Sequence, residues 1–494
     1  MAPSTTPDAA VEILLGTSRT TRCHNSLFRQ QQLKFLHDVL RNNVQDIREA
    51  IKRDTGAIDA EVTTEIAVVL NVVKEHYAGI DPKKELDEEY KVKKREDAGG
   101  RKVPWGVVYI EPELRHTPFF SIVVPLCVAV AAGNCVVLKL ETTSQSLPGL
   151  LRTFLTQALE SDTFQIVTSS PSPSATIQCF TVLQNDKETP KPTYSQLVSS
   201  SGRVIAVVDR TADLSTAASH LVTARFAYGG ASPYAPDLIL VNEFAKREFL
   251  EHVLKHAMRF LFPTSNNTSP PSSSSHNKPA KAIQASLAAL EQDPNWTLSL
   301  VSQGQNGAAI GELTCSSQTI VPLPPKVDTP LFCIHAITSL DHAVDLVSSD
   351  SDEQLLAAYH FAAPAHTKYL SQFIKADISF ANYVSSSLLL GPAAPVGHQI
   401  NQLSRYTKDQ FVRSSPVYVA SSATSPGTSS KEAEALLSDA IKEIKPKKRA
   451  EWMSLGFFEQ GILLGLGTYG IPILTCLAAS VYFGVRVGVR KWSA

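Results

Sequence analysis

The chain has 494 residues, enough for two or three packed domains and too many for one ordinary hydrophobic core. Its formal net charge is −1 at pH 7, so no acidic or basic excess points to a nucleic-acid partner, and we expect none. The seven cysteines are widely spaced and contain no CxxC pair, which argues against a disulfide framework and a zinc site. A reducing compartment is the default prediction for such a chain.

No secretory signal is predicted, because the sequence does not begin with a basic stretch followed by a long apolar run. We therefore expect the bulk of the chain in the cytosol.

The N-terminal part of the chain is predicted to be helical. From Ser26 to about Tyr77 apolar residues recur at helical spacing. This pattern predicts a helical N-terminal lobe.

Beyond residue 100 the pattern changes to short apolar runs that alternate with helical stretches. The expected strands are residues 107–110, 135–138, 204–208 and 238–241, and the expected helices include residues 147–159 and 245–261. Alternation of this kind predicts parallel βαβ units and an α/β fold, with a second α/β segment that begins near residue 206.

Three stretches have the composition of linkers or disordered segments: residues 168–174, 264–280 and 421–430. The second of them contains overlapping glycosylation sequons at Asn266 and Asn267. Because no secretory signal is predicted, we interpret that stretch as a polar cytosolic loop.

The C-terminal region carries the strongest single signal. Residues 460–485 contain no charged residue, and 26 residues at about 1.5 Å each exceed a hydrocarbon core of roughly 30 Å. Basic residues lie on both sides of this run: Lys445, Lys447, Lys448 and Arg449 before it, and Arg486, Arg490 and Lys491 after it. The sequence therefore predicts a single-pass tail anchor, and we expect the endoplasmic reticulum.

Two alternatives to a spanning helix remain. Pro472 allows a kink, and a re-entrant hairpin in one leaflet is the first alternative. A buried core helix is the weaker one, because the run is long and follows a linker. Inside the run, residues 465–470 match GxGxxG, but a phosphate-binding loop must follow a strand and open a helix, so we discount this match.

Residues 104–139, PWGVVYIEPELRHTPFFSIVVPLCVAVAAGNCVVLK, resemble the cofactor-domain core of the aldehyde dehydrogenase superfamily. A second island, residues 207–241 with Ala235-Pro236-Asp237, is similar to the opening of the catalytic domain of that family. A third, from Pro330 to Asn382, is similar to its closing part. Together the islands cover roughly residues 25–410, and the helical start with a membrane tail looks most like the class 3 branch, which includes fatty-aldehyde and fungal apocarotenal dehydrogenases.

The resemblance implies an aldehyde dehydrogenase-like α/β fold, a Rossmann-like cofactor domain plus an α/β catalytic domain with a C-terminal transmembrane helix. The expected domains are a degenerate cofactor domain with the helical lobe at residues 1–205, a catalytic-like domain at 206–385 with a disordered insert at 264–280, a bridging or oligomerisation segment at 386–420, a linker and charged helix at 421–459, and the transmembrane anchor at 460–485.

Members of the family oxidise aldehydes with NAD or NADP: a cysteine thiolate attacks the carbonyl and a glutamate activates water. The resemblance places the cysteine position at Pro233, which has neither a nucleophile nor the backbone N–H that would stabilise the oxyanion. The asparagine that supplies the other oxyanion donor in the family corresponds to His116. An imidazole can donate, but with a different geometry.

The other functional positions also depart from the family. The general-base glutamate corresponds to Ser199, which cannot take a proton from water effectively. A cofactor-binding glutamate corresponds to Lys326, and no glycine occurs between Phe164 and Gly202, where the family approaches the pyrophosphate. Of the cofactor-binding set only Lys139, which would contact the adenosine ribose, is retained. Because the other cofactor-binding residues of the family are absent, we expect Lys139 to be a surface lysine rather than a nucleotide contact.

Three other places carry residue types that could support chemistry. Cys179 and Cys315 are the nearest cysteines to the Pro233 position in the sequence, and a displaced nucleophile among them is the less favoured reading against inert apolar packing. His252 and His256 lie one helical turn apart but lack an HExxH pattern, so a solvated helix face is preferred to a metal site. No GxSxG elbow surrounds residues 199–201, which favours a polar loop.

These observations leave two hypotheses. The first is a pseudoenzyme on a membrane surface that acts by binding, as a homodimer, as a heteromer with an active homologue, or as a carrier of a lipophilic aldehyde or acid. The second is a working NAD(P)-dependent dehydrogenase of long-chain or apocarotenoid aldehydes with rearranged catalytic residues.

Overall fold

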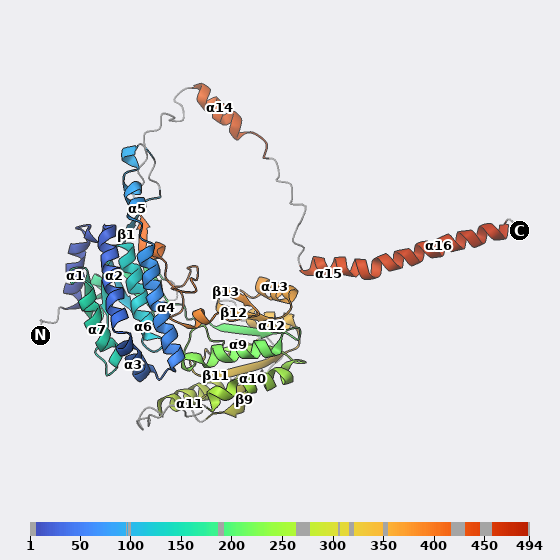
Figure 1. The fold of residues 1–494 in the computed structure, drawn as a ribbon. Helices are drawn as coiled ribbons and strands as arrows, with labels where there is room; N and C mark the ends of the chain where they lie inside the picture. The colour runs from blue at the N-terminus through green and yellow to red at the C-terminus, as the bar shows by residue number, and fades with distance from the viewer. Residues whose placement is uncertain are drawn as a thin grey trace. The chain divides into compact units, whose positions relative to one another are not determined.

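The computed structural model describes residues 6–94, 96, 100–185, 192–262, 277–304, 307–315, 321–348, 354–415, 430–444 and 457–492. Contacts divide the chain into two units, residues 1–420 and residues 421–494. The first unit is an α/β structure with two parallel or mostly parallel sheets, and its elements are coloured in chain order in Figure 1. The predicted α/β fold of the aldehyde dehydrogenase type is therefore confirmed.

The N-terminal lobe is helical, as predicted. Its helices are α1 (Pro7–Ser18), α2 (Ser26–Asn42), α3 (Val44–Thr55), α4 (Asp59–Ala78) and α5 (Pro82–Glu89). Asn25 begins α2 by accepting hydrogen bonds from the N–H groups of Leu27 and Phe28, and Gly56 ends α3 in the left-handed region at φ 70°. The apolar sides of α2 and α4 join the core that lies under the first sheet.

The first sheet has five parallel strands in the order β4-β3-β2-β5-β6. Its strands are β2 (Val107–Glu111), β3 (Cys135–Lys139), β4 (Phe164–Val167), β5 (Phe180–Leu183) and β6 (Gln196–Val198). Numbered along the chain, this is the doubly wound order 3-2-1-4-5, whose switch point lies between β2 and β5. Two crossovers contain full helices, α6 (Pro118–Ala132) and α7 (Ser146–Ala158).

Helix α6 explains why this half of the unit is well packed. All but one of its residues are buried, because it lies between the sheet and helices α2 and α4. The opposite face of the sheet is covered by α1, whose buried Ala10, Val11 and Leu14 pack with Tyr109 and Val137. An N-terminal helix thus covers a face that the connections after β4 and β5 leave open, since the only helix described there is the four-residue α8 (Pro173–Thr176).

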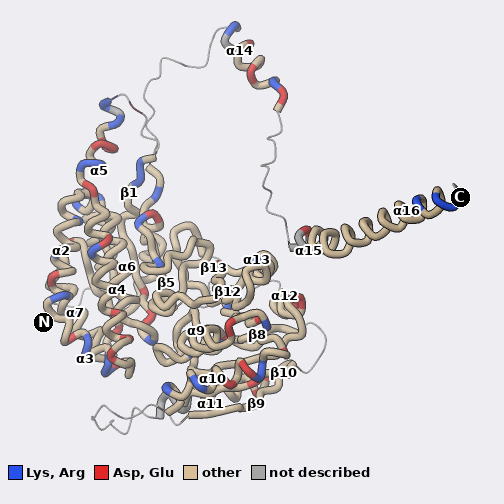
Figure 2. Tube along the Cα trace, turned by 45° about the vertical axis from the view of Figure 1, so that its right-hand side comes forward, with Lys and Arg blue, Asp and Glu red and all other residues tan. Residues whose placement is uncertain are grey.

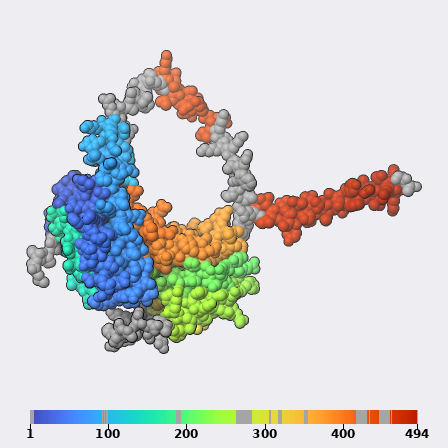
Figure 3. All heavy atoms as spheres, viewed as in Figure 1, coloured from blue at the N-terminus to red at the C-terminus, as the bar shows by residue number. Residues whose placement is uncertain are grey.

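The second sheet has seven strands in the order β13-β12-β7-β8-β11-β10-β9. They are β7 (Val204–Val208), β8 (Leu238–Asn242), β9 (Trp296–Gln303), β10 (Ala309–Cys315), β11 (Leu331–Ile337), β12 (Leu355–Phe361) and β13 (Ala376–Ala381), and only the β9–β10 pair is antiparallel. Helices α9 (Leu214–Phe226), α10 (Lys246–Leu261), α11 (Asn277–Glu291), α12 (Leu340–Ser348) and α13 (Pro364–Phe373) accompany it. Figure 3 shows the N-terminal lobe, in blue, and the part of the chain that forms this sheet, in green to orange, side by side in the first unit.

The chain then returns to the first sheet. Residues 386–396 run past the site described below, and β14 (Val412–Ser414) pairs antiparallel with β1 (Lys102–Pro104). The predicted division into domains, with its bridging segment at 386–420, stays a prediction.

Two linker predictions need correction. Residues 168–174 form a defined connection: Asp8 accepts a hydrogen bond from the N–H of Ser172, and the Ser172 hydroxyl caps α8. Serine and proline here form turns and a helix cap. The same residues are common in disordered segments, which is why the composition predicted disorder. In the predicted insert 264–280, residues 264–276 lie outside the described residues, but Asn277 begins α11, so the last four residues are helical. Of the third stretch, residues 421–429 lie outside the described residues.

The second unit is helical where it is described. It contains α14 (Ser430–Ala440) and a long apolar segment made of α15 (Phe457–Gly465), a π-helical turn at Leu466–Gly470 and α16 (Ile471–Trp492). Residues 461–492 are long and apolar enough to be a candidate membrane span. The wide turn comes just before Pro472, whose ring nitrogen cannot donate to the preceding turn, and the backbone continues without reversing direction. Figure 2 shows acidic colour at the start of α15 and basic colour toward the end of α16, with no charged residue between them.

Candidate functional site

The site begins with the loop between α9 and β8 that contains Pro233. Tyr228, Gly229 and Gly230 all have positive φ angles, of 52°, 67° and 71°. Gly230 is packed against the backbone of Pro330, so closely that an added Cβ would lie 2.6 Å from the Pro330 Cα. The loop is thereby fixed against the segment that precedes β11.

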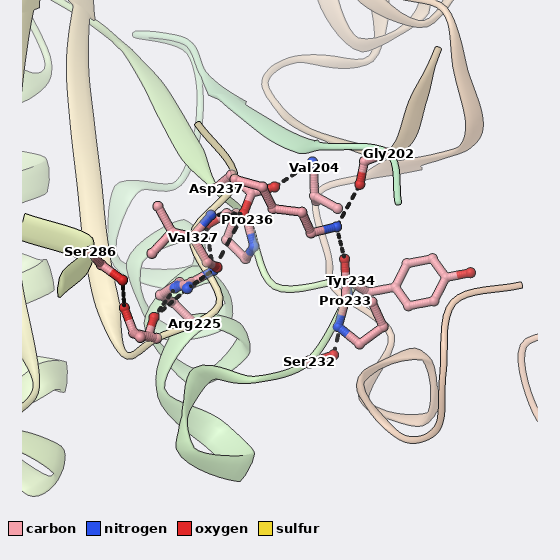
Figure 4. Close-up of polar contacts among 12 residues, drawn as sticks. Gly202, Val204, Arg225, Ser232, Pro233, Tyr234, Pro236, Asp237, Ser286 and Val327 are labelled. Carbon is pink, nitrogen blue, oxygen red and sulfur yellow. Dashed lines mark hydrogen bonds and ion pairs between the residues drawn. The ribbon is translucent and has the colours of Figure 1, made fainter. Parts of the chain in front are cut away.

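A buried arginine joins the two sides of this contact. Arg225, at the end of α9, is fully buried and donates to the carbonyl oxygens of Val327 and Thr329 (Figure 4). Its guanidinium also lies 3.7 Å from a carboxylate oxygen of Asp237, which accepts hydrogen bonds from the N–H groups of Val204 and Val327. Burial raises the pKa of Asp237, although Lys326 and Arg225 oppose that shift. The sequence analysis missed Arg225, because arginine at the end of a helix is normally exposed.

Lys326 occupies the position that the resemblance assigns to a cofactor-binding carboxylate. Its Nζ donates to the carbonyl oxygen of Gly202 at 2.6 Å and lies 3.4 Å from that of Pro233. Figure 4 shows these contacts meeting at one ammonium group between the two loops. The Lys326 side chain therefore holds the Pro233 loop to the chain that follows the first sheet. Its positive charge is directed at the carbonyl oxygens of Gly202 and Pro233.

The residue after Pro233 fills the space beneath it. Tyr234 is fully buried, its ring lies 5.1 Å from the Arg405 guanidinium, and its hydroxyl accepts from the N–H of Ala394 at 3.0 Å. Pro233 itself supplies only a carbonyl acceptor, because its ring nitrogen carries no hydrogen. No group on these two residues is a nucleophile at neutral pH.

Ser199, the predicted counterpart of the general base, lies at the end of β6. Its N–H donates to the carbonyl of Leu183, and its backbone forms a bridge with Pro395. The buried hydroxyl is next to the phenol of Tyr406, and burial raises the pKa of that phenol while Gln184 and Ser199 lower it. The position carries no carboxylate, so it offers no base for activating water.

His116, the predicted oxyanion donor, is used by the fold. Its Nε2 lies 2.9 Å from the carbonyl oxygen of Leu389, which requires the proton on Nε2. Its Nδ1 is buried and has no hydrogen-bond partner among the described residues, and the ring meets Tyr228 edge to face at 5.7 Å. Burial lowers the pKa of His116 to about 4, so the ring is neutral at physiological pH. The proton that would stabilise an oxyanion is already donated to Leu389.

Lys139 ends β3, near the switch point of the first sheet. Its Nζ lies 3.1 Å from a carboxylate oxygen of Glu111 and 3.3 Å from one of Glu141. Burial lowers the pKa of this ammonium, but the two carboxylates outweigh burial and the pKa is raised. Its charge is thus engaged within the protein.

The switch point between β2 and β5 is bridged by side chains that the sequence analysis did not single out. Gln184 accepts from the N–H of Glu113 at 2.8 Å and donates to the carbonyl of Ser121 at 3.0 Å. Asn185 donates to the carbonyl of Pro112 at 3.1 Å. Their position directly after a predicted strand was the available signal, because carboxyl ends of parallel strands meet at one edge.

These residues do not fit a dinucleotide. Such a ligand needs the crevice at the switch point, a close approach of glycine backbone and a free cation, whereas Gln184 and Asn185 bridge the crevice and Lys139 is paired. No helix of more than four residues is described between β4 and β6 to direct N–H groups at a phosphate.

The cysteines do not approach the Pro233 loop with a reactive group. Cys179 is 3% exposed, and burial raises its pKa to about 12, while Cys315 lies on β10 in the second sheet. Cys333 on β11 lies near the charges of Arg225 and Asp237, but it is fully buried and burial raises its pKa to about 12, so the thiol is neutral. A thiol in this state is a small apolar side chain.

The remaining candidates lie elsewhere. His252 and His256 lie on α10, away from the loop, and no cluster of three metal-ligating side chains occurs among the described residues. Residues 465–470, the discounted GxGxxG match, form the π-helical turn of the apolar segment and follow no strand.

Comparisons with known proteins place this geometry in context. Residues 9–179 match the aldehyde dehydrogenase family. The chain is 24% identical over 257 residues to 4,4'-diaponeurosporen-aldehyde dehydrogenase of Staphylococcus aureus, covering 47% of this chain and about half, 54%, of that relative. It is 26% identical over 368 residues to aldehyde dehydrogenase family 3 member B1 of Rattus norvegicus, covering 69% of this chain and 75% of that protein.

The fold has a solved counterpart. The structure of Staphylococcus aureus AldH in its substrate-bound state superposes with a TM-score of 0.67 at 18% identity, covering 88% of this chain and 99% of that one. At this identity the likeness concerns the fold alone. The family match ends at residue 179, just before β5, where the connections of the first sheet become short.

Proposed function

Because the chain carries an aldehyde dehydrogenase family domain, we propose that it is a pseudoenzyme of this family, which acts by binding and not by oxidising aldehydes. In this proposal the chain has lost the nucleophilic cysteine and the general-base glutamate, and the scaffold that held them is retained.

The observation that carries the proposal is the state of the Pro233 loop. Gly230 and Arg225 hold the loop in place from one side, and Lys326 binds its carbonyl group from the other. A loop kept in position by buried contacts, with a proline at the position of the nucleophile, supports loss of chemistry without loss of fold.

The cofactor region supports the same proposal. Members of the family use NAD or NADP, and in this chain the side chains of Gln184, Asn185 and Lys139 are engaged with protein groups where a dinucleotide would lie. We therefore propose that no dinucleotide binds with the affinity of a working dehydrogenase.

The place of action in this proposal is a membrane. The candidate span at 461–492 overlaps the predicted anchor at 460–485, and basic residues flank it in the sequence. We propose a single-pass tail anchor with the bulk of the chain in the cytosol, on the endoplasmic reticulum.

Three partners suit this proposal. A second copy of the chain and a catalytically complete homologue are the protein partners, because the family scaffold is retained in a chain that lacks its own chemistry. A lipophilic aldehyde or acid is the small-molecule partner, because such a ligand partitions into the membrane that the anchor would enter.

A second function, NAD(P)-dependent oxidation of long-chain or apocarotenoid aldehydes to acids, is favoured by one observation. The Staphylococcus aureus relative is named for oxidation of an aldehyde, and an anchor suits a membrane-soluble substrate. This function requires a displaced cysteine that is accessible and ionisable, and Cys333, which lies near the charges of Arg225 and Asp237, is neither.

Dinucleotide titration of the full chain in detergent tests the proposal. We expect no saturable heat on titration with NAD or NADP up to about 1 mM, the upper end of the usual KM range. The Lys139→Ala variant should behave identically. Saturable binding of either dinucleotide in the micromolar range, weakened by Lys139→Ala, would contradict the proposal.

Copurification tests the partner. A tagged chain extracted from its native membrane should retain either an untagged copy of itself or a relative with an intact cysteine and glutamate. Recovery of the tagged chain as a monomer without lipophilic ligand would contradict action by binding.

A further inference from the structure

Helix α14, Ser430–Ala440, has one apolar side that the described residues leave uncovered. Leu436 and Leu437 are 59% and 61% exposed, and Ile441, whose N–H still donates to the Leu437 carbonyl, is 73% exposed. Lys431, Ser438 and Asp439 lie on the other side of the helix at 3.6 residues per turn. Figure 2 shows acidic and basic residues along α14 in red and blue. The helix is therefore amphipathic.

An isolated helix of this length needs a partner. A helix of 11 residues is marginal in water because nucleation costs more than so few hydrogen bonds return. An ion pair at its end, between Lys442 and Asp439 at 2.6 Å, is exposed at both partners and stabilises it little. Burial of the apolar side is therefore the interaction that can stabilise helix α14.

The chain that follows α14 indicates what covers this side. Four basic residues, Lys445, Lys447, Lys448 and Arg449, come directly after Ile444, which is 93% exposed. Residues 445–456 then lead to the apolar segment at Phe457, a stretch that spans about 40 Å when fully extended. A bilayer entered by that segment is therefore within reach of α14, and basic residues are attracted to anionic headgroups.

We propose that α14 lies in the headgroup layer of the membrane that holds the anchor, with its apolar side toward the acyl chains. The partner is a lipid surface with anionic headgroups. Leu436, Leu437 and Ile441 enter the acyl boundary, and Lys431 and Asp439 face water. This inference rests on the proposed anchor.

Hydrogen exchange of the full chain tests it. The chain is placed in nanodiscs of phosphatidylcholine with phosphatidylserine, and amide exchange is measured over residues 434–441. We expect exchange at least about tenfold slower than that of the double variant Leu437→Glu/Ile441→Glu. The matched control Ala435→Glu/Ser438→Glu adds the same charge on the polar side and should keep the protection.

Two outcomes overturn the inference while leaving the anchor in place. Exchange equally fast in the parent chain and in Leu437→Glu/Ile441→Glu, with the protein still resistant to carbonate extraction, shows that α14 is unbound. A photo-crosslinker at Leu437 that captures protein and not lipid shows that the apolar side is covered by another chain or by the folded unit. Loss of carbonate resistance in the parent chain instead contradicts the anchor itself, and this inference falls with it.

Discussion

The two sheets of the first unit differ in how their strands are connected. In the seven-stranded sheet full-length helices α9, α10, α12 and α13 accompany the parallel strands, and Arg225 and Gly230 fix the loop at its edge. In the five-stranded sheet α6 and α7 follow the first two strands, but the described part of the chain after β4 and β5 holds only the short α8.

That difference separates the residues that stabilise the fold from the residues that would bind a ligand or catalyse a reaction. The cores under both sheets are apolar and well covered, so each half can fold. The shortened connections lie at the switch point, where an α/β sheet binds ligands, and side chains bridge it there. The side chains at this edge have protein partners, as Gln184, Asn185 and Lys139 show.

The largest effect should come from Arg225 in the seven-stranded sheet. Arg225→Ala removes the counter-charge beside the buried Asp237 carboxylate and leaves the carbonyls of Val327 and Thr329 without this donor. We expect a loss of about 3–5 kcal/mol in unfolding free energy, the usual cost of breaking a buried pair. Denaturant unfolding measures it. A loss below 1 kcal/mol would remove the distinction between this edge and that of the other sheet.

Two neighbouring glycines test whether the Pro233 loop is held by Pro330. Gly229 and Gly230 both have positive φ, but only at Gly230 would a Cβ collide with the Pro330 backbone. Gly229→Ala should cost about 1 kcal/mol for the backbone conformation alone, and Gly230→Ala about 3 kcal/mol or more. Thermal unfolding of the pair tests this. Equal losses would show that the loop is not held by Pro330.

Glu65 tests the first sheet through pH. Burial raises the pKa of Glu65, which accepts from the N–H of Phe120, to about 7 from its ordinary value of 4.5. Between those values the folded chain binds a proton that the unfolded chain has released, so stability is highest below pH 4.5 and falls as the pH rises toward 7.

The Glu65→Gln variant should abolish that fall. Glutamine keeps the acceptor and cannot ionise, so we expect it to be more stable than the parent by about 3 kcal/mol at pH 8 and no more stable at pH 4. Unfolding free energies across this pH range measure the difference. A parent chain whose stability rises with pH over the same interval, with that rise absent from Glu65→Gln, would contradict the assignment.

The smallest effect is expected at Lys139. Lys139→Ala removes a pair with Glu111 and Glu141 that is partly exposed at the edge of the first sheet. We expect a loss below about 1 kcal/mol, in contrast to Arg225→Ala. A loss as large as that of Arg225→Ala, in the same unfolding assay, would show that both edges are equally built into the fold.

The sequence predicted strands β2, β3, β7 and β8 to within a residue, because each is a short apolar run bounded by turn residues or charge. The same reasoning found helix α7 and the helical lobe. Each depends on a pattern that local sequence carries.

What sequence reasoning missed depends on contacts between distant segments. The burial of Arg225 requires the segment at residues 327–329, and the pairing of Lys326 with Gly202 and Pro233 requires three loops to meet. Residues 168–174 were misjudged because serine and proline suit both disorder and a capped turn. The resemblance to the family identified the positions Pro233, Ser199, His116 and Lys139. The structure shows a protein contact for each of these residues, and the loss of their catalytic or cofactor-binding roles stays a prediction.

The most direct test of the account is a single turnover. The full chain, in excess over a long-chain aldehyde and with NAD or NADP, is mixed rapidly while reduced nicotinamide is followed by absorbance. With Pro233 at the position of the nucleophile, the account predicts no reduced cofactor above a protein-free control. Formation of reduced cofactor in proportion to the chain, abolished by replacing one particular cysteine with serine, would contradict it.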